Sequence, residues 1–427
     1  MRNQHATRVA HADGAATRDR DGSRRYRLAV LNSHPIQYFA PLYRRLAARP
    51  EIDLTVLYCS DQGATSYLDR EFGQRVTWDV PLLEGYRHQV LPNLRRGGRV
   101  EGFTSLVNPG VVGAVRAGRF DALWLHSYHY VTHCLAVAAA RMAGTPLLYR
   151  TESSLTYDRR VPRPPHVRLL KPLLLRALFS QVSAFLSIGT LNTEFYLHHG
   201  VRREDVFQVP YSVDNDFFAE QAARHRPNRE RLRAELGIEP DAVVFAFPAK
   251  MTPLKRPLDA LRAYRRIPAG PPKALLMAGD GELRAEAERY AARHELDGVR
   301  FLGFVNQSDL PRVYAVSDVL LRPDGVCRGD WGLTVNEAMA AGLAVISTDC
   351  IAASTDLVEP GGNGFVVRYG DLDDLAAAMG EAVADPERCR RMGRRSAEIM
   401  ARWSYEECVQ GVLAALRHLE TPRGGNA

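Results

Sequence analysis

Short apolar runs recur along the whole chain, and most of the gaps between them carry helical patterns. In the first half of the chain these runs lie at residues 27–32, 54–59, 122–126, 146–150 and 184–189. Strands that are buried on both faces read as continuous apolar segments, so this pattern predicts a parallel sheet covered by helices.

The same alternation restarts in the second half of the chain. Its apolar runs lie at residues 243–249, 273–279, 299–304, 318–323, 344–348 and 364–368. We therefore predict two doubly wound, Rossmann-like α/β domains, an amino-terminal one at residues 26–213 and a carboxyl-terminal one at residues 214–403. A helix predicted at residues 404–420 is expected to return to the amino-terminal domain. Ligands of such sheets bind beyond the carboxyl ends of the strands, so two facing sheets predict a cleft between the domains.

Composition is that of an ordinary globular protein, with 46% hydrophobic and 25% charged residues among 427. The net charge of +7 is spread along the chain, and we predict no nucleic-acid partner. Six cysteines without a CxxC pair indicate reduced thiols and a cytoplasmic location. Residues 1–25 lack the apolar core of a secretory signal and are predicted to form a disordered tail.

A pair of lysines is the first chemical signal. The chain contains only four lysines, and two of them, Lys250 and Lys255, lie in one loop between an apolar run and a helix predicted to begin near Arg256. Cations at a strand-to-helix crevice suit a ligand that contains a pyrophosphate group. Lysine also binds phosphate well as a compact point charge. The alternative for this loop taken alone is a pair of solvated surface lysines.

Residues 329–348 combine a predicted helix with an anion-binding start. One buried face of this helix is formed by Val335, Ala338, Met339 and Gly342, which recur at helical spacing. Gly332, Leu333 and Thr334 offer backbone N–H groups and a hydroxyl at the positive end of the helix dipole. Glu337 is predicted to lie off the buried face. Its carboxylate could accept hydrogen bonds from a ribose diol, or it could simply be an acidic residue favoured by the dipole.

Residues 240–405 resemble the donor-binding half of family-four retaining glycosyltransferases, the glycosyl transferases group 1 of GT-B fold. The matching pieces are AKMTPLK (249–255), MAGDGELR (277–284), VRFLGFV (299–305), DVLLRPD (318–324), WGLTVNEAMAAGLAVIST (331–348) and NGFVV (363–367). Six matches in the same order are far more specific than any one of them alone.

The resemblance implies a set of donor-binding residues, namely Lys250, Lys255, Phe304, Val305, Gly332, Leu333, Thr334 and Glu337. The two lysines would hold the donor diphosphate, and the amides at the start of the helix would bind phosphate or sugar. Glu337 would bind the ribose hydroxyls, and the backbone of Phe304 and Val305 would meet the nucleobase.

One position departs from the family pattern. The usual two glutamates stand eight residues apart and end at Glu337, but position 329 is occupied by Gly329. Asp330 could replace the missing carboxylate after a small backbone shift. The alternative is a degenerate site that binds its ligand without turning it over.

The amino-terminal half is expected to bind the acceptor. His126 ends an apolar run at the position where the family places a histidine facing the donor sugar, and it joins Asp330 and Glu337 as a predicted catalytic residue. His129 and His133 lie close by and could compete for this role. The candidate acceptor contacts are His34, Gln37, Tyr38, Arg150 and Glu152. An Asp-x-Asp sequence within residues 210–218 resembles the metal motif of the other glycosyltransferase fold, but its position is wrong, so we predict no metal.

By this resemblance we predict a metal-independent, retaining hexosyltransferase that needs no cofactor. It would move a hexose or N-acetylhexosamine from a nucleotide-diphosphate sugar, expected to be UDP-linked, to a hydroxyl of a small-molecule or glycan acceptor. An aminocyclitol of antibiotic biosynthesis is one such acceptor. The alternatives are a non-catalytic nucleotide-sugar-binding protein, favoured by Gly329, and a nucleotide-sugar epimerase of the same fold. Residues 159–179, which are both basic and apolar, predict either a domain helix or a peripheral membrane contact.

Overall fold

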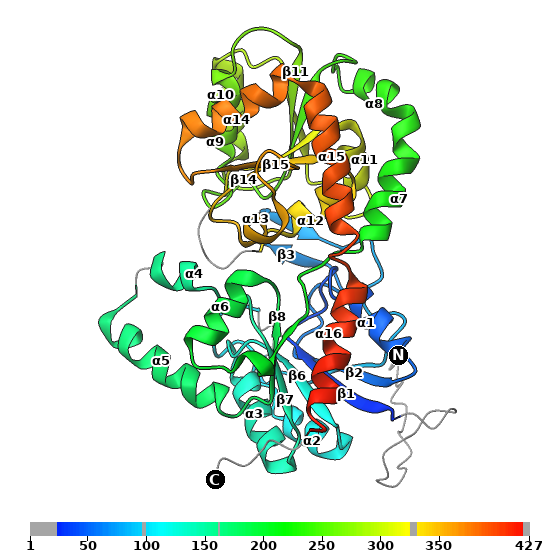
Figure 1. Ribbon diagram of the computed structural model, residues 1–427, viewed down its shortest axis with the longest axis vertical. Helices are drawn as coiled ribbons and strands as arrows, with labels where there is room; N and C mark the ends of the chain where they lie inside the picture. Colours follow the sequence, from blue (N-terminus) through cyan, green and yellow to red (C-terminus); the bar gives the residue numbers. More distant parts are fainter. Residues whose placement is uncertain (1–23, 96–99, 161–162, 325–330, 422–427) are drawn as a thin grey trace.

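The computed structural model describes residues 24–95, 100–160, 163–324 and 331–421. Two α/β domains lie one above the other along the long axis of the molecule (Figure 1). The amino-terminal domain contains a seven-stranded sheet and the carboxyl-terminal domain a six-stranded sheet. Two facing Rossmann-like domains confirm the predicted fold class.

The first sheet has the strand order β5-β2-β1-β6-β7-β8-β9, and all of its pairs are parallel. Its strands are β1 (Tyr26–Asn32), β2 (Ile52–Tyr58), β5 (His88–Val90), β6 (Ala122–His126), β7 (Leu147–Arg150), β8 (Ala184–Ser187) and β9 (Val206–Gln208). The helices of this domain are α1 (Ala40–Ala47), α2 (Gly110–Gly118), α3 (Val131–Ala143), α4 (Leu155–Arg160), α5 (Pro165–Phe179) and α6 (Thr190–His198). Every residue of β7 and β8 is buried, as expected for central strands covered on both faces.

The second sheet has the strand order β12-β11-β10-β13-β14-β15, again parallel throughout. Its strands are β10 (Val243–Pro248), β11 (Lys273–Ala278), β12 (Val299–Gly303), β13 (Val319–Arg322), β14 (Ala344–Thr348) and β15 (Gly364–Val367). The helices are α7 (Asn215–His225), α8 (Arg229–Glu235), α9 (Pro257–Arg266), α10 (Arg284–Arg293), α11 (Leu310–Val316), α12 (Leu333–Ala340), α13 (Ala352–Leu357), α14 (Leu372–Ala384) and α15 (Pro386–Met400).

Each sheet reverses its direction of winding at its first strand. In the first sheet β1 lies between β2 and β6, and in the second sheet β10 lies between β11 and β13. The loops that leave the carboxyl ends of two such neighbouring strands diverge to opposite faces and open a crevice. The fold therefore places the loops after β1 and β6, and the loops after β10 and β13, at ligand-binding positions.

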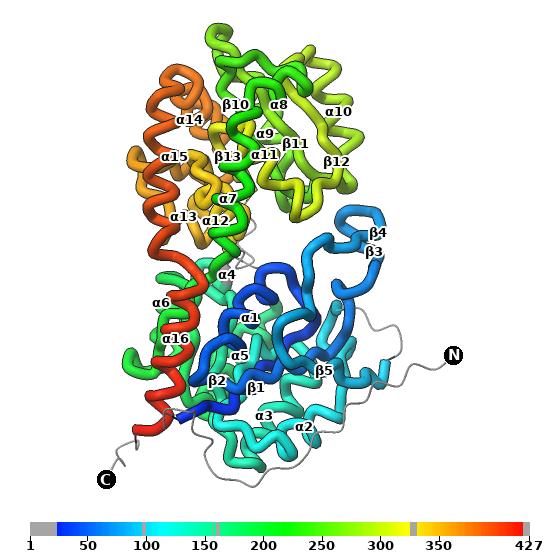
Figure 2. Tube along the Cα trace, turned by 90° about the vertical axis from the view of Figure 1, so that its right-hand side faces the viewer, coloured from blue at the N-terminus to red at the C-terminus, as the bar shows by residue number. Residues whose placement is uncertain are grey.

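A two-stranded hairpin, β3 (Tyr67–Asp69) and β4 (Gln74–Val76), projects from the first domain and reaches the second (Figure 2). Just beyond it, Thr77 accepts a hydrogen bond of 2.8 Å from the side chain of Asn306 in the other domain. Strands of three residues with partly exposed side chains carry no apolar run, so the sequence pattern did not predict this hairpin.

The last helix, α16 (Tyr405–His418), follows α15 out of the second domain and runs along the first (Figure 1). Tyr405 donates a hydrogen bond of 2.7 Å to the backbone carbonyl of Tyr38, and His418 lies 3.0 Å from the carboxylate of Asp205. Of the predicted tail, residues 1–23 lie outside the described part. Arg24, which the prediction included in the tail, pairs instead with Asp121 and Glu420.

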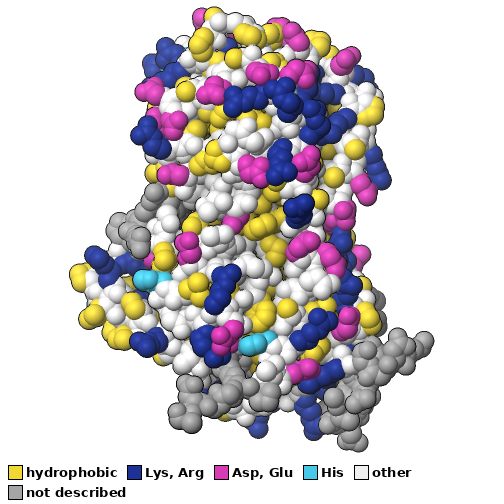
Figure 3. All heavy atoms as spheres, viewed as in Figure 1, with side chains coloured by type: hydrophobic (Ala, Val, Ile, Leu, Met, Phe, Trp, Pro, Cys, Tyr) yellow, Lys and Arg dark blue, Asp and Glu magenta, His cyan; other side chains and the backbone are white. Residues whose placement is uncertain are grey.

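The described helices include none that is both long and apolar enough to cross a membrane. Helix α5 nevertheless exposes several leucines, among them Leu169 at 72% and Leu173 at 62% of their surface. Figure 3 shows hydrophobic side chains together with Lys and Arg at the lower left of the molecule, where α5 lies.

We predict that Gly411→Ala destabilises the contact between α16 and the first domain. A Cβ atom at Gly411 would overlap the carbonyl oxygen of Gln208 in β9, so the helix must shift away. We expect the free energy of unfolding to fall by about 1–3 kcal/mol, as for other overpacked sites. The matched control is Gly380→Ala in α14, where the new methyl group meets nothing within 4 Å. The control should raise stability by about 0.5–1 kcal/mol. Equal urea midpoints for the two variants would contradict this account of the α16 contact.

Candidate functional site

A network of charges fixes the loop after β13. Arg322, the last residue of β13, donates two hydrogen bonds of 2.7 and 2.6 Å to the carboxylate of Asp324, and both side chains are buried. Lys255 approaches the same carboxylate at 3.0 Å from the loop after β10. Arg322 also donates to the hydroxyl of Thr334 at the start of α12. Two predicted donor residues, Lys255 and Thr334, therefore meet around an ion pair whose roles the sequence analysis missed, although both of its members lie in the quoted piece DVLLRPD.

The start of α12 has the geometry of an anion-binding site. Gly332 precedes the helix with a φ of 87°, and a Cβ atom there would lie 2.7 Å from the side chain of Ile351. Both facts favour glycine. The first N–H groups of any α-helix have no partner within that helix, and here they belong to residues that include Leu333 and Thr334. The helix therefore offers the predicted amides at the carboxyl edge of the sheet.

Glu337 is buried on the same helix, with 8% of its surface exposed. Its position differs from the prediction that it would lie off the buried face. Helix α12 is buried on almost all sides, and Tyr314 of α11 donates a hydrogen bond of 2.8 Å to the Glu337 carboxyl group. Burial raises the pKa of Glu337 to about 7, while hydrogen bonds from Tyr314 and Gln307 act in the opposite direction.

Lys250 lies in a different environment from Lys255. Its ammonium group binds Asp69 at 2.9 Å and Glu71 at 2.7 Å, both in the hairpin of the other domain, and lies 4.8 Å from the ring centre of Phe72. Burial alone would lower the pKa of Lys250, but these carboxylates outweigh it and raise the pKa above its ordinary value.

Phe304 contacts the same hairpin. Its ring meets that of Phe72 edge-on at a centroid distance of 4.9 Å, and Val305 follows it at the carboxyl end of β12. The β3–β4 hairpin therefore covers the predicted diphosphate and nucleobase residues from the side of the first domain.

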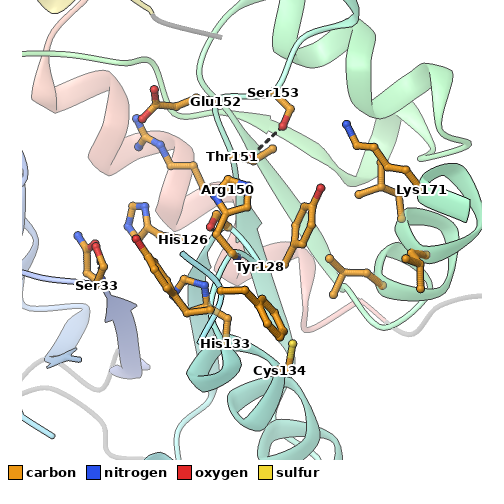
Figure 4. Close-up of a pocket in the computed structure, with 18 of the residues that line it drawn as sticks. Ser33, His126, Tyr128, His133, Cys134, Arg150, Thr151, Glu152, Ser153 and Lys171 are labelled. Atoms are coloured by element: carbon orange, nitrogen blue, oxygen red, sulfur yellow. Dashed lines mark hydrogen bonds between the residues drawn. The ribbon is translucent and has the colours of Figure 1, made fainter. Parts of the chain in front are cut away.

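A large cavity lies in the first domain, with a volume of about 1030 Å³. It is lined by the residues that follow β1, β6 and β7, by α5 and by Tyr211. Of the residues predicted to act on the sugar or the acceptor, His126, Tyr38, Arg150 and Glu152 line this cavity, as do His129 and His133. Figure 4 shows His126, His133 and Arg150 on one side of the pocket and Lys171 of α5 on the other.

The structure does not bring His34 and Gln37 into this lining. His34 is half-buried beside Ser33, whose hydroxyl lies 2.9 Å from the Nδ1 atom of His34. Burial lowers the pKa of His34 to about 4, so its ring is neutral at physiological pH. This geometry suits a residue that holds the loop after β1.

His126 ends β6 in an aromatic environment. Its ring stacks on Trp124 at 4.9 Å and meets Phe39 at 4.7 Å, and its Nε2 atom lies 3.3 Å from the hydroxyl of Tyr43. Burial, followed by the nearby charge of Arg150, lowers the pKa of His126 well below its ordinary value. The imidazole is therefore neutral at physiological pH.

Tyr211, in the linker between the domains, joins the two halves of the site. Its hydroxyl donates a hydrogen bond of 2.7 Å to Glu152, while its carbonyl accepts one of 2.9 Å from Asn336 in α12. Asn336 in turn accepts a hydrogen bond of 2.8 Å from the indole of Trp331. The large cavity and the start of α12 are therefore connected through one residue, which the sequence analysis had assigned only to the linker.

Other predictions concern the metal and the missing glutamate. The described residues contain no group of three or more metal-ligating side chains that could hold an ion. Of the Asp-x-Asp pair, Asp214 caps α7 and Asp216 pairs with Arg45. Gly329 and Asp330 lie outside the described residues.

Comparison with known proteins finds a family match in the second domain. Residues 228–399 match the family described as "Glycosyl transferases group 1". The D-inositol 3-phosphate glycosyltransferase of Nocardia farcinica is 32% identical over 241 residues, which cover 53% of this chain and 51% of the relative. The protein of the same name from Kribbella flavida is 27% identical over 324 residues, which cover 70% of this chain and 72% of the relative. The chain thus matches about half the length of the first relative.

Solved structures share the whole architecture. Anabaena Alr3699/HepE in complex with UDP and glucose has a TM-score of 0.67 at 18% identity and covers 92% of this chain and 99% of its own. WaaG, a glycosyltransferase of lipopolysaccharide biosynthesis, has a TM-score of 0.61 at 16% identity, with coverages of 93% and 100%. At these identities the likeness concerns the fold, which is that of the GT-B glycosyltransferases.

We predict that Glu337 makes stability depend on pH. Its carboxyl group titrates near 4.5 when unfolded and near 7 when folded, so only the folded state keeps the proton between these values. The stabilisation is complete below about pH 4.5 and is lost as the pH rises to about 7. We expect the advantage to be roughly 3 kcal/mol. Glu337→Gln should have a flatter melting-temperature profile across this window. Profiles that fall in parallel would show that Glu337 does not titrate there.

Proposed function

We propose that this chain transfers a sugar from a nucleotide-diphosphate donor to an acceptor hydroxyl. Its carboxyl-terminal domain matches the glycosyl transferases group 1, and its fold is that of the GT-B glycosyltransferases. One observation carries the proposal. A cationic, amide-rich loop region in one domain and a large cavity in the other both lie at the winding reversals of their sheets, and Tyr211 connects them.

The donor half would stabilise the leaving diphosphate. Lys255 and the N–H groups at the start of α12 supply positive charge where negative charge develops on the departing oxygen. Glu337 is proposed to accept hydrogen bonds from the ribose. The backbone of Phe304 and Val305 would then meet the base, with the hairpin closing over it.

Lys250 would contribute in a different way from Lys255. Its two carboxylate partners belong to the other domain, so a diphosphate must compete with them for the ammonium group. We propose that Lys250 holds the domains together around the donor as well as binding it.

The transferred sugar would face His126 from the acceptor side. In a retaining transfer, the acceptor oxygen forms its bond to the anomeric carbon on the face that the diphosphate leaves. The acceptor proton passes to an oxygen of the departing diphosphate. Asp330 is proposed to take the place of the carboxylate missing at Gly329.

The donor and acceptor classes are narrower proposals. A UDP-linked hexose is supported by the complex of the Anabaena protein with UDP and glucose, and an N-acetylhexosamine is proposed as the alternative sugar. Two relatives are named for D-inositol 3-phosphate, which supports a cyclitol or another small polyol in the 1030 Å³ cavity, beside the glycan alternative. We place the reaction in the cytoplasm because the cysteine pattern predicts reduced thiols.

Peripheral membrane contact through residues 159–179 is also proposed. Helix α5 exposes Leu169 and Leu173 beside the exposed Arg168 and Arg176, a combination that suits an anionic lipid surface.

The proposal is tested with a panel of nucleotide sugars in thermal-shift assays, followed by turnover with mixed acceptors. Stabilisation by a donor together with formation of a glycoside would support it. Stabilisation without any turnover would favour the non-catalytic binding protein, and a change in the donor sugar without an acceptor would favour an epimerase.

We predict that Lys255→Ala weakens binding of the nucleoside diphosphate by about 1.5–3 kcal/mol, the worth of a charge-assisted hydrogen bond. The fold should persist because Arg322 still pairs with Asp324. Lys273→Ala is the matched control. Lys273 is the first residue of β11, so it lies at the amino end of the strand, away from the loops of the proposed site. Calorimetry should show weaker binding only for the Lys255 variant, and an unchanged dissociation constant would remove Lys255 from the site.

We predict that turnover survives a metal chelator. The proposed site stabilises the diphosphate with lysine and helix amides, so it requires no divalent cation. Initial rates should be equal with and without the chelator. Complete loss of activity that magnesium or manganese restores would contradict this assignment.

A further inference from the structure

Arg150 stands out among the residues that line the large cavity. It ends β7 and only 3% of its surface is exposed, yet its Nε and Nη1 atoms have no hydrogen-bond partner among the described residues. A guanidinium group stays protonated in proteins and carries five N–H donors. A buried charge without a partner is costly, so it must be compensated by other interactions.

Aromatic rings supply part of this compensation. The guanidinium carbon of Arg150 lies 5.5 Å from the ring centre of Phe39, 5.8 Å from that of Trp124 and 5.0 Å from that of Tyr211. Ring faces attract the positive charge but cannot accept the in-plane N–H bonds of the fork. The rings therefore hold Arg150 in place at the cavity wall and leave donors for a ligand.

Cationic side chains outnumber carboxylates in the described lining of the cavity, which contains Arg150, Arg163 and Lys171. His133 is 1% exposed, and neither of its ring nitrogens has a hydrogen-bond partner among the described residues. Lys171 lines the opposite wall, where it binds Asp158 at 2.6 Å. Glu152 is the single carboxylate among the described lining residues, and it accepts a hydrogen bond from Tyr211.

We infer that Arg150 binds an acidic group of the acceptor, a phosphate monoester or a carboxylate, while the acceptor hydroxyl faces His126. The inference rests on the proposed function and defines the class of its acceptor. The planar fork of arginine matches two oxygens of such a group, and a charge-assisted pair of this kind is stronger than a neutral hydrogen bond. Leu170, Leu174 and Leu178 of α5 form an apolar wall of the cavity, which would pack against the remaining part of the acceptor.

Two sources could present this acidic group. One is a free phosphorylated polyol, and the other is a phosphate attached to a lipid, whose tail would leave along the exposed leucines of α5. The chemistry at Arg150 is the same in both cases, so the experiment compares them directly.

The test measures binding to the full chain by calorimetry without any donor present. The soluble probes are inorganic phosphate and inositol phosphate, and inositol is the neutral control compound. The lipid probe is a phosphatidylcholine vesicle that contains phosphatidic acid, and a vesicle of pure phosphatidylcholine is its control. The variants are Arg150→Gln and Arg150→Lys, with Arg116→Gln as the control, because Arg116 is exposed on α2, away from α5 and outside the cavity lining.

We expect the phosphorylated probes to bind more tightly than the neutral ones. Arg150→Gln should weaken the binding of the phosphorylated probes roughly 10- to 100-fold. Arg150→Lys should recover part of this loss, and Arg116→Gln should behave as the wild type. Preference for the soluble probes identifies a free phosphate, and preference for the vesicles identifies a lipid phosphate.

Equal binding of charged and neutral probes, or failure of the phosphorylated probes to bind, would overturn the inference. If Arg150→Gln does not fold, the wild-type comparison and Arg150→Lys still decide the question. UDP binding is measured in parallel on the same proteins. Its absence in the wild type would count against the proposed function, whereas normal UDP binding with no phosphate preference would count against the inference alone.

Discussion

The buried ion pair between Arg322 and Asp324 is the interaction on which the carboxyl-terminal half of the site depends. Burying two charges costs more free energy than it returns unless the remaining hydrogen-bonding groups are satisfied. In this pair the remaining hydrogen-bonding groups position side chains of nearby loops, because Asp324 also binds Lys255 and Arg322 also binds Thr334. The backbone carbonyl of Asp324 accepts a further hydrogen bond from Thr348 at the end of β14. One pair therefore aligns three loops at the carboxyl edge of the sheet.

The two halves of the crevice are held at a defined separation by polar contacts across the domain boundary. Tyr211 binds Glu152 on one side and Asn336 on the other. The β3–β4 hairpin binds Lys250 and packs on Phe304. These contacts are ionic, aromatic or single hydrogen bonds, which opening of the crevice can break and remake at modest cost. For the proposed transfer, such an interface would let the domains close around a substrate and then release it.

The cavity of the first domain has a different physical character from the donor half. The donor half positions its cations with carboxylates, as Asp324 does for Lys255, whereas Arg150 is surrounded by aromatic rings. Rings support a cation without saturating its N–H donors. His126 lies within this group of rings and stays neutral there, since burial and Arg150 both disfavour its protonated form. The chain thus keeps one permanent charge beside one neutral imidazole at the proposed point of transfer.

The sequence by itself determined the fold class and most of the long buried strands. Buried strands read as apolar runs, so the limits of β6 and β14 were predicted to the residue. The family resemblance named Lys255, Gly332 and Glu337, because motif and glycine signals are local in the chain. Tertiary structure alone decided the rest. Pairing of Lys250 with Asp69, the link from Glu152 through Tyr211 to Asn336, and the burial of Glu337 against Tyr314 join residues that are distant in the chain. Packing, rather than residue order, sets such distances, and with them the partners and pKa of each charge.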